Sequence, residues 1–506
     1  MKAFLMHADR DFDLEQKPPW NEQALLQDLE LPSLFSAMAQ GDEFLFEVAK
    51  SAIVSGIDLN VSAVRYRQDI LKDCLRNPLI VRSLYDLSIR AIETPKKISW
   101  GIWGMFPESI LTRSIDVLGL LVTLLKELRN IATERADRFK SEGFRTLFTM
   151  LRRELSDEYI VSVSAHLKQL RFRGGVLISA GLGKANKGVD YVLRRTCESN
   201  QNWIDRIKRF FAERPPTYSY HLHPRDDAGA KALSELKDRG IHLAANALAQ
   251  ATDHVLGFFR MLRTELGFYI GCMNLHERLT KRGEPTCFPV PVEPAKHGIS
   301  FKGLCDVCLA MNSKGGVIGN DLNGDHKELV IITGANQGGK STFLRSVGLA
   351  QLMMQSGMFV AANSFSANVC DGLFTHFTRA EDVTMKSGKL DEELSRMNEI
   401  VDHIRPNSLI LFNESFAATN EREGSEIARQ IISALLEKRV QVFFVTHLFT
   451  FAIGLYRKRM ERAVFLRAER RDDGSRPFKL IEGEPLETSY GEDLYRELFL
   501  DKAVQE

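Results

Sequence analysis

The sequence has 506 residues, of which 44% are hydrophobic and 26% are charged, and its formal net charge is +1. This length exceeds that of one compact core, so we expect roughly two to four domains. The near-zero charge excludes a general attraction to nucleic acid, so any such surface must be local. The seven cysteines are too few for a disulfide framework and fit a reducing compartment, and we interpret the lone CxxC at residues 305–308 as packing rather than as a zinc or redox site.

The N-terminal sequence and the hydropathy pattern both argue against a membrane protein. Asp9, Arg10 and Asp11 interrupt any apolar run of the kind found in signal peptides. The longest apolar stretch, residues 117–125, is far shorter than the ~20 residues that span a bilayer. We therefore expect a cytoplasmic protein with no membrane partner.

Residues 1–28 are mixed and polar, so we expect an N-terminal lead-in there. Beyond it the pattern is helical: apolar residues recur at helical spacing over residues 71–84, and residues 114–128 predict a second helix that is apolar on most of its face. Residues typical of turns lie between the two helices: Pro95, Gly101, Gly104 and Pro107.

Residues 144–170 are again helical, and residues 171–179 then change to the pattern of a strand. The sequence GLGK at residues 181–184 is similar to a phosphate loop. Helix signals do not follow it, so a hairpin turn is the better interpretation.

The region around this hairpin is basic. Residues 166–214 carry eleven Lys or Arg against four Asp or Glu, and they include Phe172, Tyr191 and Trp203. Basic residues interleaved with aromatic ones suit a nucleic-acid surface. A solvated basic face is an equally good interpretation of the composition.

A long helix is predicted next. Apolar residues alternate by threes and fours over residues 228–279, with Gly240 as a point where the helix could bend. Prolines at high density over residues 285–294 then end the helical pattern and indicate a domain boundary. We expect a mostly α-helical domain over residues 29–284, followed by an α/β domain over residues 285–506.

The second domain contains a nucleotide-binding motif. Short apolar runs at residues 329–333, 409–412 and 440–445 are typical of a buried parallel sheet. The first run leads into G-x-x-x-x-G-K-S-T and then into a helical pattern, the required setting of a P-loop. The predicted phosphate-binding residues are Gly334, Ala335, Asn336, Gln337, Gly338, Gly339, Lys340, Ser341 and Thr342. Lys340 would neutralise phosphate charge, and the Ser341 hydroxyl would bind Mg²⁺ of a bound MgATP.

Hydrolysis requires further groups near the metal and the attacking water. Residues 408–414, SLILFNE, have the form of the second ATPase strand, and they make Glu414 the candidate to position or deprotonate water. Asn413 stands where Asp is usual, so the metal set of Ser341, Asn413 and Glu414 should bind Mg²⁺ more weakly. His447 follows the next strand and could contact the γ-phosphate, so we predict Glu414, His447 and Lys340 as catalytic residues.

The motif resembles that of the MutS family, whose loop reads TGPNMGGKST where residues 333–342 read TGANQGGKST. Shorter segments agree in the same order along the chain. They are residues 317–321, 358–362, 377–382, 387–388, 446–447 and 489–491.

The resemblance implies an ABC-type P-loop ATPase domain, preceded by a helical core and lever domain. Two subunits would sandwich ATP, with a signature loop containing Ser387, Gly388 and Ser395 reaching the partner's nucleotide. Ile318 and Asn320 would edge the adenine, and Phe478 would stack on it. DNA would be gripped by the helical domain, with residues 166–225 as a reduced clamp.

The departures from the family pattern carry expectations of their own. Helical signals begin near residue 29 and the chain ends soon after residue 491, so we expect neither a mismatch-reading domain nor a C-terminal nuclease domain. Leu390 falls where a serine that contacts the partner's γ-phosphate is expected, and Ser387 or Ser395 could replace it.

Two functions follow from these residues. The first is a dimeric, MutS-like, ATP-dependent DNA-binding protein that does not read mismatches directly. The second is a nucleotide-gated scaffold with very slow hydrolysis that recruits a downstream protein partner, because Asn413 weakens the metal site. A transport or SMC-type ATPase is a weaker third possibility, since membrane segments and a long coiled-coil arm are not apparent.

Overall fold

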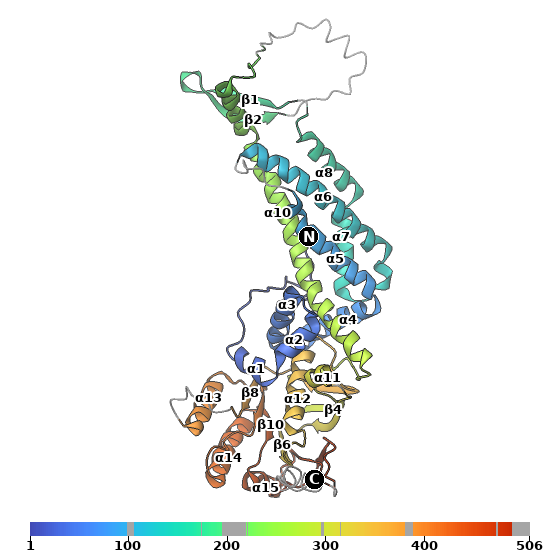
Figure 1. Cartoon of the computed structure of the whole chain (residues 1–506), viewed down its shortest axis with the longest axis vertical. Coiled ribbons are helices and arrows are strands. Elements are labelled where there is room, and N and C mark those ends of the chain that lie inside the picture. Colours follow the sequence, from blue (N-terminus) through green and yellow to red (C-terminus); the bar gives the residue numbers. More distant parts are fainter. Residues whose placement is uncertain are drawn as a thin grey trace, which may run out of the picture. The chain divides into compact units, whose positions relative to one another are not determined.

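The computed structural model describes most of the chain and divides it into two compact units (Figure 1). The described residues are 1–98, 106–173, 175–194, 219, 221–294, 298–313, 315–379, 388–471 and 474–487. The helical unit comprises Met1–Lys2, Ser83–Ala136 and Phe148–Arg263. The sheet unit comprises Ala3–Arg82, Asp137–Leu147 and Thr264–Glu506. Within the described residues, no helix combines the length and apolar composition needed to cross a membrane.

Among its described residues, the helical unit contains all or part of five α-helices and a β-hairpin, and three of these helices continue into the sheet unit. Its elements are α5 (Pro78–Lys97), α6 (Pro107–Glu134), η2 (Ala136–Arg138), α7 (Glu142–Glu154), α8 (Asp157–Gln169), β1 (Leu177–Leu182), η3 (Lys184–Asn186), β2 (Gly188–Arg194) and α10 (Asp227–Lys281). The helices α5, α7 and α10 cross the unit boundaries, and η2 lies at one of them.

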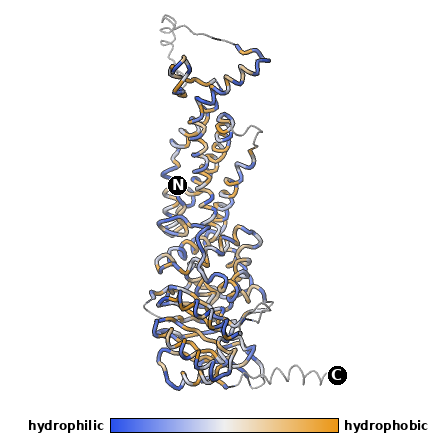
Figure 2. The backbone as a smooth tube through the Cα atoms, turned by 90° about the vertical axis from the view of Figure 1, so that its left-hand side faces the viewer, coloured by the Kyte–Doolittle hydropathy of each residue, from blue (hydrophilic) through white to orange (hydrophobic). Residues whose placement is uncertain are grey.

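Helix α6 confirms the helix expected at residues 114–128 and extends it in both directions. Its buried positions, among them Leu118, Leu121, Leu125 and Leu128, recur at intervals of three and four, so one stripe of the helix faces the core. Figure 2 shows the same alternation of hydrophobic and hydrophilic colours along the helices. Pro95 does not form the expected turn: it lies inside α5.

The expected hairpin is present, with β1 and β2 paired antiparallel, but its first strand begins at Leu177, and Gly181 and Leu182 belong to that strand, so the turn lies at residues 183–187. Gly240, expected to bend the long helix, has another role. Helix α10 runs through it without interruption, and a Cβ there would lie 2.4 Å from the Ile178 side chain of the hairpin. The glycine therefore lets β1 approach α10 closely.

The sheet unit combines N-terminal helices with two larger sheets. Its N-terminal elements are α1 (Glu22–Asp28), α2 (Leu31–Ala39), α3 (Glu43–Val54), η1 (Ser55–Asp58) and α4 (Val61–Arg76). The elements that follow α10 are β3 (Val290–Val292), β4 (Gly298–Leu304), α11 (Val307–Asn312), β5 (Asn320–Asp325), β6 (Leu329–Gly334), α12 (Lys340–Gln355), β7 (Ser364–Asn368), β8 (Leu373–Phe377), α13 (Lys389–His403), β9 (Leu409–Asn413), α14 (Glu421–Glu437), β10 (Gln441–Val445), α15 (Phe449–Arg457), β11 (Ala463–Ala468) and β12 (Leu480–Glu482).

The strands expected from the three apolar runs are β6, β9 and β10, and they lie in one sheet of order β12-β11-β6-β10-β9-β8. Strands β11, β6, β10, β9 and β8 are parallel neighbours, and β12 is antiparallel. A second sheet has the order β3-β7-β4-β5. The parallel strands are nearly continuous hydrophobic runs because helices cover both faces of the sheet.

The core residues show which helices cover each face. Side chains of α13, α14 and α15 form one buried cluster with alternate strand residues such as Ile331, Phe412 and Phe444. Helix α12 packs on the other face, where a Cβ at Gly348 would lie 2.8 Å from Leu411. The chain is thus mixed helical and sheet, as expected, whereas the domain boundaries at 28 and 284 stay a prediction.

The first twelve residues are more ordered than their composition indicates. Glu265 of α10 is fully buried, and its carboxylate accepts backbone N–H groups of Leu5 at 2.5 Å, Met6 at 3.2 Å and Phe12 at 3.0 Å. Burial raises the pKa of this carboxyl to about 7, against the effect of the three hydrogen bonds. Glu265 thus holds the N-terminal segment in the core, together with side chains that donate to its carbonyls: Tyr66 to Phe4, Arg67 to Met6 and Tyr269 to Leu5.

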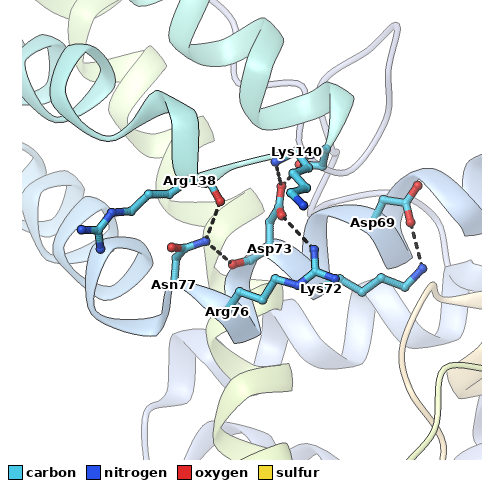
Figure 3. Close-up of polar contacts among 8 residues, drawn as sticks. Asp69, Lys72, Asp73, Arg76, Asn77, Arg138 and Lys140 are labelled. Carbon is cyan, nitrogen blue, oxygen red and sulfur yellow. Dashed lines mark hydrogen bonds and ion pairs between the residues drawn. The ribbon is translucent and has the colours of Figure 1, made fainter.

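Asp73 has a similar role at the junction of α4 and α7 (Figure 3). Its side chain is 1% exposed, and Oδ2 accepts the N–H groups of Lys140 at 2.7 Å and Ser141 at 2.6 Å. Asn77 Nδ2 donates to the carbonyls of Asp73 and Arg138, both at 3.1 Å. Because Lys140 and Ser141 directly precede α7, Asp73 fixes the backbone that leads into this helix.

We expect Asp73→Ala to lower the free energy of unfolding by about 3 kcal/mol, because two backbone N–H groups lose a charged acceptor. Denaturant titration followed by circular dichroism would measure the loss. Asp69→Ala is the matched control on the same helix, since Asp69 is exposed and pairs only with Lys72 among the described residues. The control should change stability by less than about 1 kcal/mol, and equal effects of the two substitutions would contradict the assigned role of Asp73.

Candidate functional site

The loop between β6 and α12, residues 334–339, has a conformation that depends on glycine. Gly334 has φ of 105° and Gly339 has φ of 87°, both in the left-handed region that residues with a Cβ rarely adopt. A Cβ on Gly334 would lie 2.8 Å from the backbone nitrogen of Ala468 in β11. We call this segment the glycine loop; it leads directly into the N-terminus of α12, where free N–H groups favour anions.

Lys340 lies at the first position of α12 and folds back over the glycine loop. Its side chain is buried, and Nζ donates to the carbonyl oxygens of Gly334 at 2.8 Å and Ala335 at 2.9 Å. Burial lowers the pKa of Lys340 to about 8, a shift opposed by the nearby Glu414 carboxylate. Because no carboxylate in the described part of the chain bonds this buried ammonium, it is poised for an anion that the loop would hold.

Ser341 and Asn413 meet although they are 72 residues apart in the sequence. The Ser341 hydroxyl donates to Asn413 Oδ1 at 3.0 Å. Asn413 ends β9, and β9 pairs with β10, which in turn pairs with β6. The parallel register thus brings the two predicted metal ligands to the same edge of the sheet.

Glu414 and His447 form the second polar pair at this edge. His447 Nε2 lies 3.0 Å from Glu414 Oε1. The hydrogen bond to His447 lowers the pKa of Glu414 below its ordinary value, against the effect of burial, and Lys340 adds to the lowering. Glu414 is therefore a carboxylate at neutral pH, able to accept a proton or a hydrogen bond.

These groups open onto one cavity of about 730 Å³. It is lined by Leu304, Asp306, Leu309, Ser313, Gly316, Val317, Ile318, Asn320, Asn336, Gln337, Gly338, Gly339, Lys340, Ser341, Thr342, Phe343, Ser346, Glu414, His447 and Phe478. Of the residues predicted to bind nucleotide or metal within this chain, three do not line it. Gly334 and Ala335 instead accept from Lys340, and Asn413 stands behind Ser341.

The two predicted base-binding side chains, Ile318 and Phe478, are 46% and 51% exposed and line this cavity. Asn320 is buried and has a positioning role. Its Nδ2 donates to the carbonyl of Phe478 at 3.2 Å, and its Oδ1 accepts the N–H of Leu480 at 2.8 Å. Asn320 therefore holds the backbone that carries Phe478, and its own amide is already engaged.

Sequence analysis missed the contribution of β4 and α11 to the cavity. Asp306 lines it, caps α11 by accepting the N–H of Leu309 at 2.9 Å, and binds Arg345 Nε at 2.5 Å. No spacing rule connects these residues to the glycine loop. The neighbouring Cys305 and Cys308 are buried free thiols bonded to backbone carbonyls, as expected for packing cysteines.

Comparison with known proteins places these motifs in a family. A profile described as MutS2 N-terminal domain matches residues 59–282, and one described as MutS domain V matches residues 330–504. The chain belongs to the MutS family.

Individual MutS relatives match shorter parts. The DNA mismatch repair protein MutS of Lactobacillus delbrueckii subsp. bulgaricus is 31% identical over 226 residues, which are 42% of this chain and 26% of that protein. The DNA mismatch repair protein MutS of Thermus aquaticus is 37% identical over 139 residues, 27% of this chain and 17% of that protein. The match thus spans about a quarter or less of the length of these relatives.

The MutS resemblance also assigned a signature loop. Gly388 directly precedes α13, and Ser395 lies exposed on that helix. Ser387 lies outside the described residues, as do Ala380, Glu381 and Asp382 of the preceding motif and the terminal motif at residues 489–491. The assignment of the signature loop stays a prediction.

The Lys340 environment predicts a measurable pH dependence. The pKa of Lys340 is about 8 when folded, against 10.5 ordinarily, so folding disfavours its proton and stability rises with pH between these values. From pH 7 to pH 10, the free energy of unfolding of the wild type should rise by about 2 kcal/mol relative to Lys340→Met. Denaturant titrations at several pH values would measure this difference.

Lys438→Met is the control for this prediction, because Lys438 is exposed on the same unit and follows α14. The free energy of unfolding of Lys438→Met relative to the wild type should not change with pH. If the difference in free energy of unfolding between the wild type and Lys340→Met were also independent of pH, burial would not destabilise the charged form of Lys340.

Proposed function

We propose that the sheet unit is an ABC-type P-loop ATPase domain that binds MgATP in this cavity, and that the chain is a MutS-like, ATP-dependent DNA-binding protein. The convergence of Lys340, Ser341 and the Glu414–His447 pair on one cavity, with Asn413 bonded to Ser341 from behind, carries the proposal. The Glu414–His447 pair has no structural need to share a cavity with Ser341 and a glycine loop.

The site fits the phosphates and the base of a nucleotide. The glycine loop offers N–H groups and the end of a helix, and Lys340 supplies a positive charge that a phosphate would neutralise. Ile318 and Phe478 present exposed apolar surface to the same cavity, suited to a base. A volume of about 730 Å³ lies within the range of small-molecule sites.

The site also fits Mg²⁺, because its donors are hard oxygens: the Ser341 hydroxyl, the Asn413 amide oxygen and the Glu414 carboxylate. When bound, Mg²⁺ would neutralise charge on the β- and γ-phosphates. Asn413 supplies hydrogen bonding without charge, so the affinity for the metal should be lower than with Asp.

Hydrolysis depends on what Glu414 and His447 can do. The ionised Glu414 carboxylate would orient water or accept its proton, and His447 at 3.0 Å would fix the direction of that carboxylate. Lys340 would stabilise the negative charge of the phosphates. The weaker metal binding caused by Asn413 would then limit the rate of ATP hydrolysis.

The MutS relatives support the remaining parts of the proposal. A dimer would place Gly388 and Ser395, with Ser387, against the partner's nucleotide, and closing the dimer would tighten the grip on DNA. The hairpin of the helical unit presents exposed cations for phosphate contacts, namely Lys184, Lys187 and Arg194. A cytoplasmic location fits this role.

The scaffold function is favoured by one observation, the uncharged Asn413 beside Ser341. If hydrolysis is very slow, ATP would set a dimeric shape that a downstream protein recognises.

The ATP turnover of the wild type, Glu414→Gln and Asn413→Asp distinguishes the two functions. We expect Glu414→Gln to lower kcat at least about 100-fold while ATP still binds, because a general base is lost. Asn413→Asp should raise kcat and lower the Mg²⁺ concentration needed for half-maximal rate. A coupled phosphate-release assay would measure both.

Glu437→Gln, an exposed change at the end of α14, is the control and should match the wild type. An inert wild type that Asn413→Asp activates would favour the scaffold. Failure of labelled ATP to bind the wild type at all would contradict the nucleotide site.

DNA binding should weaken as salt rises, because phosphate contacts release counterions. Removing the three hairpin cations together should flatten the slope of log K against log salt by about 2–3, at roughly 0.9 per phosphate contact. Fluorescence anisotropy with duplex and branched DNA would measure this, with Lys458→Ala on the sheet unit as control. Absence of binding to any DNA at low salt would contradict the proposal.

A further inference from the structure

The turn that follows β9 carries Glu414 in a conformation that its own sequence does not favour. Glu414 has φ of 57° and Phe416 has φ of 63°, so two non-glycine residues of one turn are left-handed. Such conformations are uncommon for residues with a Cβ and persist only when surrounding contacts hold them. The orientation of the Glu414 carboxylate therefore depends on whatever holds this turn.

Backbone contacts hold its first half. The N–H of Glu414 donates to the carbonyl of Val445 at the end of β10 at 2.9 Å. The Thr378 hydroxyl, just after β8, donates to the carbonyl of Glu414 at 2.7 Å. These contacts tie Glu414 to its neighbouring strands and leave the second half of the turn to other groups.

Glu393 holds the second half. It lies on α13, and its Oε2 accepts the N–H of Phe416 at 2.8 Å. On the other side of the same residue, the Phe416 carbonyl lies against α14, where a Cβ on Gly424 would come within 2.4 Å of it. The backbone of Phe416 is thus confined between a carboxylate and a glycine.

A buried histidine fixes the residue between Glu414 and Phe416. His376 Nδ1 lies 2.7 Å from the Ser415 hydroxyl, which also contacts the carbonyl of His376 at 2.6 Å. His376 Nε2 lies 2.9 Å from the carbonyl of Glu393, and the His376 ring stacks on Phe416 with centroids 5.3 Å apart. Glu393, His376 and the turn are therefore one connected network.

The burial of Glu393 is not explained by the stability of α13. The side chain is 1% exposed, and Oε1 has no hydrogen-bond partner among the described residues. A buried carboxylate with one unpaired oxygen is costly, and an apolar residue would pack there without that cost. The contact with Phe416 is what the carboxylate provides.

We propose that Glu393 is a positioning residue for Glu414, holding the left-handed turn so that the Glu414 carboxylate faces His447 and the glycine loop. The proposal rests on the proposed function, in which Glu414 orients or deprotonates water. Because α13 begins directly after Gly388, Glu393 also ties the helix of the expected signature loop to this turn.

The test compares Glu393→Ala, which removes the acceptor, with Glu393→Gln, whose amide oxygen can still accept from Phe416. We expect Glu393→Ala to lower kcat about tenfold to a hundredfold, because small displacements of catalytic groups have effects of this size. Its affinity for fluorescent ATP should stay within about twofold of the wild type, since Glu393 does not line the cavity. Glu393→Gln should keep most of the activity. Glu399→Ala, an exposed change on the same helix, is the control.

A second readout does not depend on turnover. In protein labelled with ¹³C-histidine, the ring signal of His447, assigned by its loss in His447→Ala, should shift in Glu393→Ala in the same direction as in Glu414→Gln. It should stay in place in Glu399→Ala.

The proposal would be overturned if Glu393→Ala hydrolysed ATP at the wild-type rate and its His447 ring signal matched that of the wild type. Equal loss of ATP binding in both Glu393 variants would also overturn it, since that would show a role in folding. If the wild type does not hydrolyse ATP, the hydrolysis part of the proposed function fails, and the His447 signal still decides whether Glu393 positions Glu414.

Discussion

The parallel pairing of β6, β10 and β9 decides where the polar groups of the candidate site lie. These strands are buried hydrophobic runs, and their register aligns Ile332 with Val445 and Val445 with Asn413. The residues that follow each strand therefore emerge at one edge, and the glycine loop, Glu414 and His447 meet there. If one strand slipped by a single residue, its alternate side chains would exchange faces and the site would not assemble.

At that edge of the sheet, partly buried groups of opposite charge lie close together. No carboxylate among the described residues bonds Lys340, so burial destabilises its charge, whereas Glu414 is stabilised as a carboxylate by His447. Such opposite shifts are typical of sites that bind or transform charged ligands. The buried Glu393 adds a second carboxylate, which acts on the backbone of the turn and does not line the cavity.

Buried carboxylates also hold irregular backbone away from the site. Glu265 and Asp73 are buried acids whose oxygens accept backbone N–H groups from segments remote in the sequence. In each case a segment without regular pairing of its own is held by a carboxylate on a helix. Irregular backbone can be buried only when such acceptors are available. The ordered N-terminal residues and the start of α7 are both consequences of this constraint.

Local spacing determined much of this protein: the glycine loop, the helix behind it, the buried strands, the hairpin and the long helix all follow from periodicity and residue type over a few residues. The MutS resemblance rests on the same short segments. Only the tertiary structure decided which distant residues touch. The burial of Lys340, the Ser341–Asn413 contact and the hold of Glu393 on Phe416 join different elements, and Asp306 enters the cavity from a strand and helix with no motif. Gly240 and Pro95 show the same limit, because both lie inside helices despite their intrinsic preference for turns, and Gly240 is where β1 approaches α10 closely.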